Sequence, residues 1–182
     1  MFQKFSKMTF ALGLALLACS GEQAQISSNR VEAQISGKQI SLYAPTGFCF
    51  DAATFTKTRG QMTAQEQVDI VASPCEIQDG KIVVKPLTHS IFYGAKLAEQ
   101  INLKVFEQLF LENDHPKPKT WIVDDVLWIQ NSATSKKSWQ VRTLFSNNGI
   151  NYLIMVKEHQ QTRSHTHSLE IMNQIVKRVK EN

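Results

Sequence analysis

The sequence lacks the short motifs that mark the common catalytic and nucleotide-binding sites. It contains no Gly-x-Ser-x-Gly nucleophile elbow, no glycine-rich phosphate loop, no dinucleotide-binding glycine triplet and no His-Glu-x-x-His zinc motif. Many active sites are assembled from scattered residues, so these absences lower the expectation of an enzyme without excluding one. We therefore expect no catalytic residues and no cofactor, and we keep a hydrolase-type enzyme with a non-standard site as the least favoured alternative.

Clustered positive charge and long apolar segments are absent as well. The 20 basic and 16 acidic residues give a formal charge of +4, and the loss of Lys4 and Lys7 with residues 1–18 lowers it to +2. This mild balance argues against nucleic acid as a partner. The apolar run at residues 8–17 is too short to span a membrane, which takes about 20 residues.

The N-terminus has the organisation of an export signal. Lys4 and Lys7 form a positively charged start, the apolar run follows, and the small residue Ala18 ends it. This order is typical of secretory signal peptides, which are removed from the mature protein. We expect residues 1–18 to be a signal peptide.

Leu16-Leu17-Ala18-Cys19 resembles the lipobox of bacterial lipoproteins, in which a peptidase cuts before a cysteine that carries diacylglycerol. The resemblance implies that Cys19 is the lipidated N-terminus. Ser20, rather than Asp, follows it, which implies export to the outer membrane, with the domain facing the periplasm. Two or three acyl chains would hold the domain firmly, since each buried methylene contributes about 0.8 kcal/mol. An ordinary signal cut near Ala18, with Cys19 incidental, is the alternative.

With Cys19 used as the anchor, Cys49 and Cys75 remain. An even pair of cysteines in an oxidising compartment predicts a disulfide. Closing a loop of about 27 residues contributes roughly 3.5 kcal/mol in the chain-entropy model. Two free buried thiols, or a nucleophilic cysteine, are the alternatives.

Residues 19–38 are rich in Ser, Gln, Glu and Asn, which predicts a flexible tether. We expect residues 39–182 to form a single domain, because the chain that remains after cleavage is long enough for one proper core. Apolar periodicity predicts an α+β fold, with a mainly antiparallel sheet of about six or seven strands and two main helices at about 95–111 and 166–181.

Two hairpins in the second half of the chain can be given a register. A turn at Asp124-Asp125 would place Trp121 opposite Trp128, with both faces of the ribbon apolar and therefore covered. A type I′ turn at Asn148-Gly149 would place Phe145 opposite Tyr152 and Val141 opposite Val156.

The element order of the second half, a meander followed by a C-terminal helix, resembles the PsbP/Mog1 sandwich. That resemblance implies an accessory subunit, by analogy of fold alone. The segment Pro45-x-Gly47-Phe48-Cys49-x-Asp51, followed by a strand and a second cysteine, is similar to a group of uncharacterised bacterial envelope proteins. This group implies no activity.

Few other residues are candidates for a site. His165 and His167 come nearest to a metal pair, but they precede or begin a helix among Gln, Ser and Thr, so we assign no metal site. Phe92, Tyr93 and Trp139 are the aromatic residues that would mark a partner surface if they are exposed, and we favour ordinary core for them.

These observations predict a lipid-anchored periplasmic accessory or binding domain that interacts with another envelope protein. The first alternative is a lipoprotein that binds a small ligand or a metal in a cleft beside the sheet. The second is the enzyme with a non-standard site.

Acylation of Cys19 is directly testable. We expect the intact mass of the protein purified from membranes to correspond to residues 19–182 plus acyl chains, and a Cys19→Ala variant to lose that added mass. An unmodified thiol on Cys19 would contradict this prediction.

Overall fold

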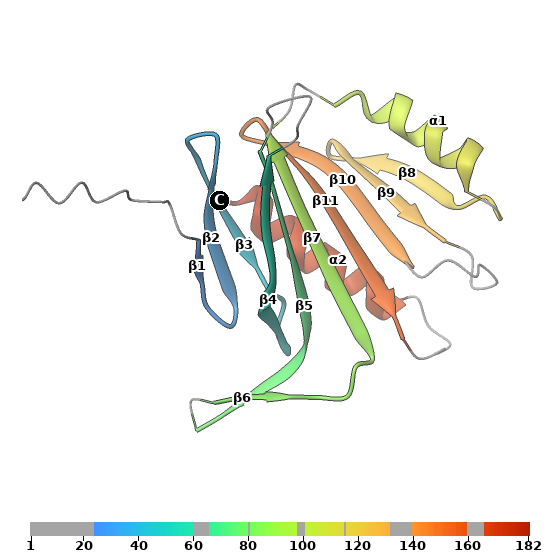
Figure 1. Ribbon diagram of the computed structural model, residues 1–182. Coiled ribbons are helices and arrows are strands. Elements are labelled where there is room, and N and C mark those ends of the chain that lie inside the picture. Colours follow the sequence, from blue (N-terminus) through green and yellow to red (C-terminus); the bar gives the residue numbers. More distant parts are fainter. Residues whose placement is uncertain are drawn as a thin grey trace, which may run out of the picture.

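A computed structural model describes residues 24–59, 66–79, 81–97, 101–114, 116–131, 140–159 and 166–182. They form strands and two helices arranged in layers (Figure 1). The strands are β1 (Gln25–Ile26), β2 (Arg30–Ile35), β3 (Lys38–Tyr43), β4 (Phe48–Arg59), β5 (Glu66–Gln78), β6 (Lys81–Val84), β7 (His89–Leu97), β8 (Lys119–Val123), β9 (Val126–Gln130), β10 (Val141–Asn147) and β11 (Ile150–Glu158). The helices are α1 (Leu103–Asn113) and α2 (Thr166–Lys180).

The larger of two sheets has eight strands, in the order β4-β5-β7-β11-β10-β9-β8, and β6 pairs only with β5. All of its pairings are antiparallel. The predicted α+β class with a mainly antiparallel sheet is therefore confirmed. The expected six or seven strands are too few, since a second sheet of three strands, β1-β2-β3, is also present.

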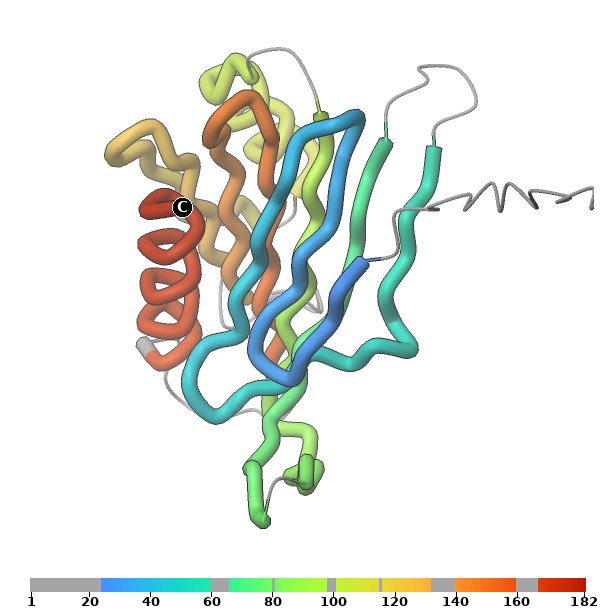
Figure 2. The backbone as a smooth tube through the Cα atoms, turned by 90° about the vertical axis from the view of Figure 1, so that its left-hand side faces the viewer, coloured from blue at the N-terminus to red at the C-terminus, as the bar shows by residue number. Residues whose placement is uncertain are grey.

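One face of the large sheet is covered by α2 and by the small sheet, which lie side by side (Figure 2). The side chains between these layers form the main core. Its fully buried members come from every layer and include Val31, Leu42, Ile70, Tyr93, Ile154 and Ile175. The main core therefore joins the large sheet, the small sheet and α2.

Within the described ranges, the opposite face is covered only at its β8-β9-β10 end, by α1. Leu127 and Ile129 of β9 and Leu144 of β10 are buried there, with Phe110 of α1 packed against them. Alternate residues of β9 face the other way, and Trp128 belongs to the main core. The expected covering of both faces thus holds for β9, whereas β8 is at most half-buried and Val123 at its end is 52% exposed.

A buried ion pair fixes the C-terminal end of α1 on the sheet. Asp114, the C-cap residue, accepts a hydrogen bond from the Arg142 guanidinium of β10. Arg142 also donates to Asn131 Oδ1 at 3.0 Å, and its guanidinium lies 4.7 Å from the centre of the Phe110 ring. The other end of α1 is capped by Asn102, whose side chain accepts from the first free backbone N–H groups of the helix.

The predicted registers of both hairpins are confirmed. Trp121 pairs with Trp128, and their rings stack with centroids 6.0 Å apart. Phe145 pairs with Tyr152, and Val141 pairs with Val156. The turn residues Asn148 and Gly149 have positive φ values of 52° and 73°, as a type I′ turn requires.

The first predicted helix, 95–111, is wrong at its start. Residues up to Leu97 belong to β7, and α1 begins at Leu103. An apolar strand end followed by an amphipathic helix produces one unbroken apolar pattern, which hid the boundary. The second helix, predicted at 166–181, is present as α2.

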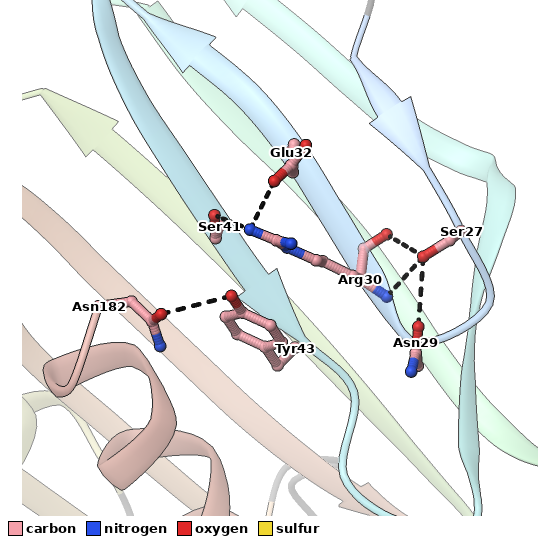
Figure 3. A network of polar contacts seen from close by, with 7 residues as sticks. All are labelled: Ser27, Asn29, Arg30, Glu32, Ser41, Tyr43 and Asn182. Carbon is pink, nitrogen blue, oxygen red and sulfur yellow. Dashed lines mark hydrogen bonds and ion pairs between the residues drawn. The ribbon is translucent and has the colours of Figure 1, made fainter.

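The predicted tether is wrong from Ala24 onward, while residues 19–23 lie outside the described part of the chain. Val31, Ala33 and Ile35 of β2 are buried, and the polar residues between them face outward. On this outer surface Arg30 forms an ion pair with Glu32 at 2.5 Å (Figure 3). The strand was missed because its polar composition outweighed its two-residue alternation.

Loss of the Asp114 carboxylate should destabilise the fold, because it leaves the buried Arg142 charge without its ionic partner. We expect Asp114→Ala to lower the free energy of unfolding by about 3–5 kcal/mol in urea. Glu181→Ala, which removes the exposed pair with Lys177 at 3.9 Å, is the matched control and should change little. Equal effects of the two substitutions would contradict the role given to the buried pair.

Candidate functional site

The uncovered part of the large sheet forms a groove beside α1. Its floor comes from β5, β7, β10 and β11. Its wall comes from α1 and from Ile101, which precedes the helix. The groove has a volume of about 360 Å³. Its lining is mainly apolar, with the side chains of Phe92, Ile101, Phe106, Leu144, Leu153 and Met155.

One carboxylate lies on the floor of this groove. Asp69 of β5 pairs with Gly94 of β7, and both of its carboxylate oxygens accept from Gln67 Nε2 at 2.8 Å. A Cβ atom on Gly94 would lie 3.1 Å from the Phe92 ring and 3.2 Å from Asp69 Oδ1. The glycine therefore allows the ring and the carboxylate to lie against the floor, a close approach that a strand glycine often marks.

A row of polar side chains borders the groove on one side. Lys96 of β7 pairs with Gln67 of β5 and with Asn151 of β11, so the three side chains cross the sheet in a line. Ser146 of β10 donates a hydrogen bond to the Asn151 side chain and extends the line. The apolar surface thus has a polar rim at one edge.

The chemistry of the groove suits binding. The described side chains that line it include no histidine, cysteine or hydroxyl group. An apolar floor and wall with a carboxylate and a few other polar groups is the usual composition of a ligand pocket. The site can therefore hold an apolar body and accept hydrogen bonds from a donor group attached to it.

The aromatic residues singled out in the sequence are separated by the alternation of β7. Phe92 faces the groove, whereas Tyr93 is fully buried in the main core and donates to the Tyr43 carbonyl at 2.9 Å. Burial raises the pKa of the Tyr93 hydroxyl well above its usual range. Tyr93 therefore belongs to the core, as favoured for these aromatic residues, and not to a partner surface. Trp139 lies outside the described residues.

The stacked pair Trp121 and Trp128 borders another hollow of about 420 Å³ near the end of α2. Lys177 and Lys180 also line it, but Lys180 donates to the Asp124 carbonyl at 2.5 Å. Its ammonium is thus already used to tie α2 to the β8–β9 turn. We therefore prefer the groove beside α1 as the candidate site.

Cys49 and Cys75 form a disulfide, with their Cα atoms 5.7 Å apart. The bond joins the start of β4 to β5 at the point where β5 leaves the sheet. Both cysteines are buried. The bond lies away from the groove, so its role in the structure is a link between strands. Cys19, the expected lipidation site, is outside the described residues.

The sequence suggested His165 and His167 as the nearest approach to a metal pair, but in the structure the neighbour of His167 is His89. His167 of α2 lies beside His89 of β7, with ring centroids 5.3 Å apart, and His165 is outside the described residues. His159, which follows β11, forms a hydrogen bond of 2.8 Å with Ser90 Oγ. Within the described ranges, no three His, Cys, Asp or Glu side chains are arranged to hold a metal ion.

Searches with protein-family models, among curated proteins and among solved structures find no match to this chain. Neither of the described helices has the length and apolar character needed to cross a membrane.

Sequence reasoning missed the groove residues Asp69, Gly94 and Leu153. They form one row across the sheet, although they are far apart in the chain. The only local signal was Gly94, a glycine inside an apolar strand with no turn residue beside it.

Burial of His89 makes stability depend on pH. Desolvation lowers the pKa of His89, and the nearby Glu158 raises it. The neighbouring His167 and His159 lower the pKa of His89 further. The unfolded chain therefore binds a proton more readily below about pH 6.5, and the folded state loses stability as the pH falls. We expect the free energy of unfolding to be smaller at pH 5.5 than at pH 7.5.

The variant His89→Gln should remove part of this pH dependence, because the glutamine does not titrate. His167→Gln is the control, because the His167 side chain is 61% exposed, and it should remove less. An unchanged pH dependence in His89→Gln would show that other groups cause it.

Proposed function

We propose that this protein is a lipid-anchored binding domain of the bacterial cell envelope and that the groove beside α1 is its binding site. The groove itself is the observation that supports this function. It is an apolar depression of about 360 Å³ beside α1, on the part of the sheet face that the described helix leaves open, and it contains a carboxylate. Its size and composition match those of small-molecule sites.

The ligand class follows from the lining. Phe92, Leu153 and Met155 offer an apolar floor for a hydrocarbon or aromatic body. Asp69 offers a negative charge, and the uncharged Gln67 amide that donates to both of its oxygens leaves that charge in place. The groove therefore suits a small amphipathic molecule with a cationic or hydrogen-bond-donating head, delivered to a domain that acylated Cys19 holds at the membrane.

A second candidate is the accessory role, in which the same site takes part of another envelope protein. Val105, Phe106 and Leu109 of α1 are 52%, 39% and 46% exposed, and Phe106 also lines the groove. The apolar surface therefore continues from the groove over α1. An apolar segment of a protein partner would cover both, whereas a small ligand would leave Leu109 exposed.

Two probes test the ligand assignment. N-phenyl-1-naphthylamine is apolar and neutral, and dodecyltrimethylammonium is apolar and cationic. We expect both to bind saturably, and Phe92→Ala to weaken both by about tenfold through lost apolar contact. Asp69→Asn should weaken only the cationic probe, because it removes the charge and keeps the shape of the side chain.

Leu109→Ala is the matched control, since Leu109 lies on α1 outside the groove, and it should bind both probes like the wild type. Absence of saturable binding, or unchanged binding to Phe92→Ala, would overturn the ligand assignment. A photo-crosslinking residue at position 109 that captures one envelope protein in cells, with capture lost in Cys19→Ala, would instead favour the accessory role.

A further inference from the structure

The end of β5 and β6 form a two-stranded arm that leaves the body of the domain (Figure 1). We define the arm as residues 75–79 and 81–84. Apolar exposure in the described chain is concentrated here and just beyond it. The exposed fractions are 58% for Ile77, 50% for Ile82, 41% for Val83, 77% for Val84 and 49% for Leu87.

The two faces of the arm differ in character. Ile77 pairs with Ile82, and Val84 pairs with the disulfide residue Cys75, so these side chains share one face. On the other face Val83 lies opposite Glu76, which forms an ion pair with Lys85 at 2.9 Å. The arm is therefore an amphipathic ribbon whose more apolar face is Ile77, Ile82 and Val84.

The root of the arm is held rigidly. The disulfide ties Cys75 to β4, and the Cys75 backbone N–H donates to the Gly47 carbonyl at 3.0 Å. The Lys85 N–H donates to the Pro74 carbonyl at 3.1 Å on the other side. The exposed apolar side chains are thus presented by an anchored hairpin, which gives them a fixed position on the domain.

The position of the arm relates it to the expected lipid anchor. Five residues, 20–24, separate Cys19 from Gln25 at the start of β1, so they reach at most about 20 Å. Figure 1 shows β1 and the outer end of the arm at the same side of the molecule. A lipid on Cys19 would therefore hold that side close to the bilayer.

We propose that the arm lies on the bilayer surface, with Ile77, Ile82 and Val84 in the interfacial layer of the membrane that carries the lipid anchor. This inference rests on the proposed acylation of Cys19. The apolar side chains of the arm are all aliphatic, whereas protein interfaces depend mainly on Trp, Tyr and Arg. The Lys81 ammonium group can lie at the phosphate level while the aliphatic groups are buried.

Site-specific photo-crosslinking tests this orientation in the full acylated chain. Benzoylphenylalanine replaces Val84 in one variant and Leu109, on the distant α1, in the other. Both side chains are exposed, so both variants should fold. In vesicles of phosphatidylethanolamine and phosphatidylglycerol we expect at least ten times more lipid adduct at position 84 than at position 109.

Equal or absent lipid adducts at position 84 would overturn the proposal. In cells, an adduct between position 84 and a protein, including a second copy of this chain, would also overturn it and make the arm a protein-docking element. The intact mass of the same sample reports acylation separately, and the probe titrations report the groove. Failure of the arm proposal can therefore be told apart from failure of the proposed function.

Discussion

The Asp114–Arg142 ion pair determines how much of the large sheet is covered. An eight-stranded sheet presents two faces, and here α2 and the small sheet cover one of them over the main core. Among the described residues, α1 alone lies on the other face, and its C-terminus is tied to β10 by the buried pair. Because that contact holds the helix over β8, β9 and β10, the surface of β5, β7 and β11 stays open as the groove.

Because side chains alternate along each strand, the two faces of the large sheet carry different residues. Tyr93 and Ile154 point into the closed core, while their neighbours Phe92 and Leu153 point into the groove. A substitution at a core-facing position therefore changes mainly the stability of the fold. A substitution at a groove-facing position changes mainly the exposed surface. This separation is compatible with the proposed binding site on a sheet whose opposite face holds the fold together, and it makes Phe92 a better position than Tyr93 for testing that proposal.

The sequence was most informative where structure is decided locally. Asn148-Gly149 has the backbone freedom of a type I′ turn, and this turn alone sets the register that pairs Phe145 with Tyr152. It was least informative where pairing joins distant segments. The burial of β2 depends on Ile70 and other partners far along the chain, so a polar composition suggested a tether instead.

The groove could not be predicted from the sequence, because it too depends on pairing between distant segments. Asp69, Gly94 and Leu153 become neighbours only through the strand order β5-β7-β11, and no local pattern predicts that order. The start of α1 could have been found, because Asn102 is a good N-cap and accepts from two backbone N–H groups. Apolar periodicity outweighed that signal.

The small sheet and the groove lie on opposite faces of the large sheet, and this arrangement has a consequence for the proposed function. The small sheet, which begins at β1 only a few residues after Cys19, packs on the core face, and the groove opens on the other. A lipid on Cys19 would draw the small sheet toward the bilayer and turn the groove away from it. A ligand would then arrive from the aqueous side. An amphipathic molecule with a polar head is more compatible with that route than a wholly apolar lipid, because its free form is soluble there.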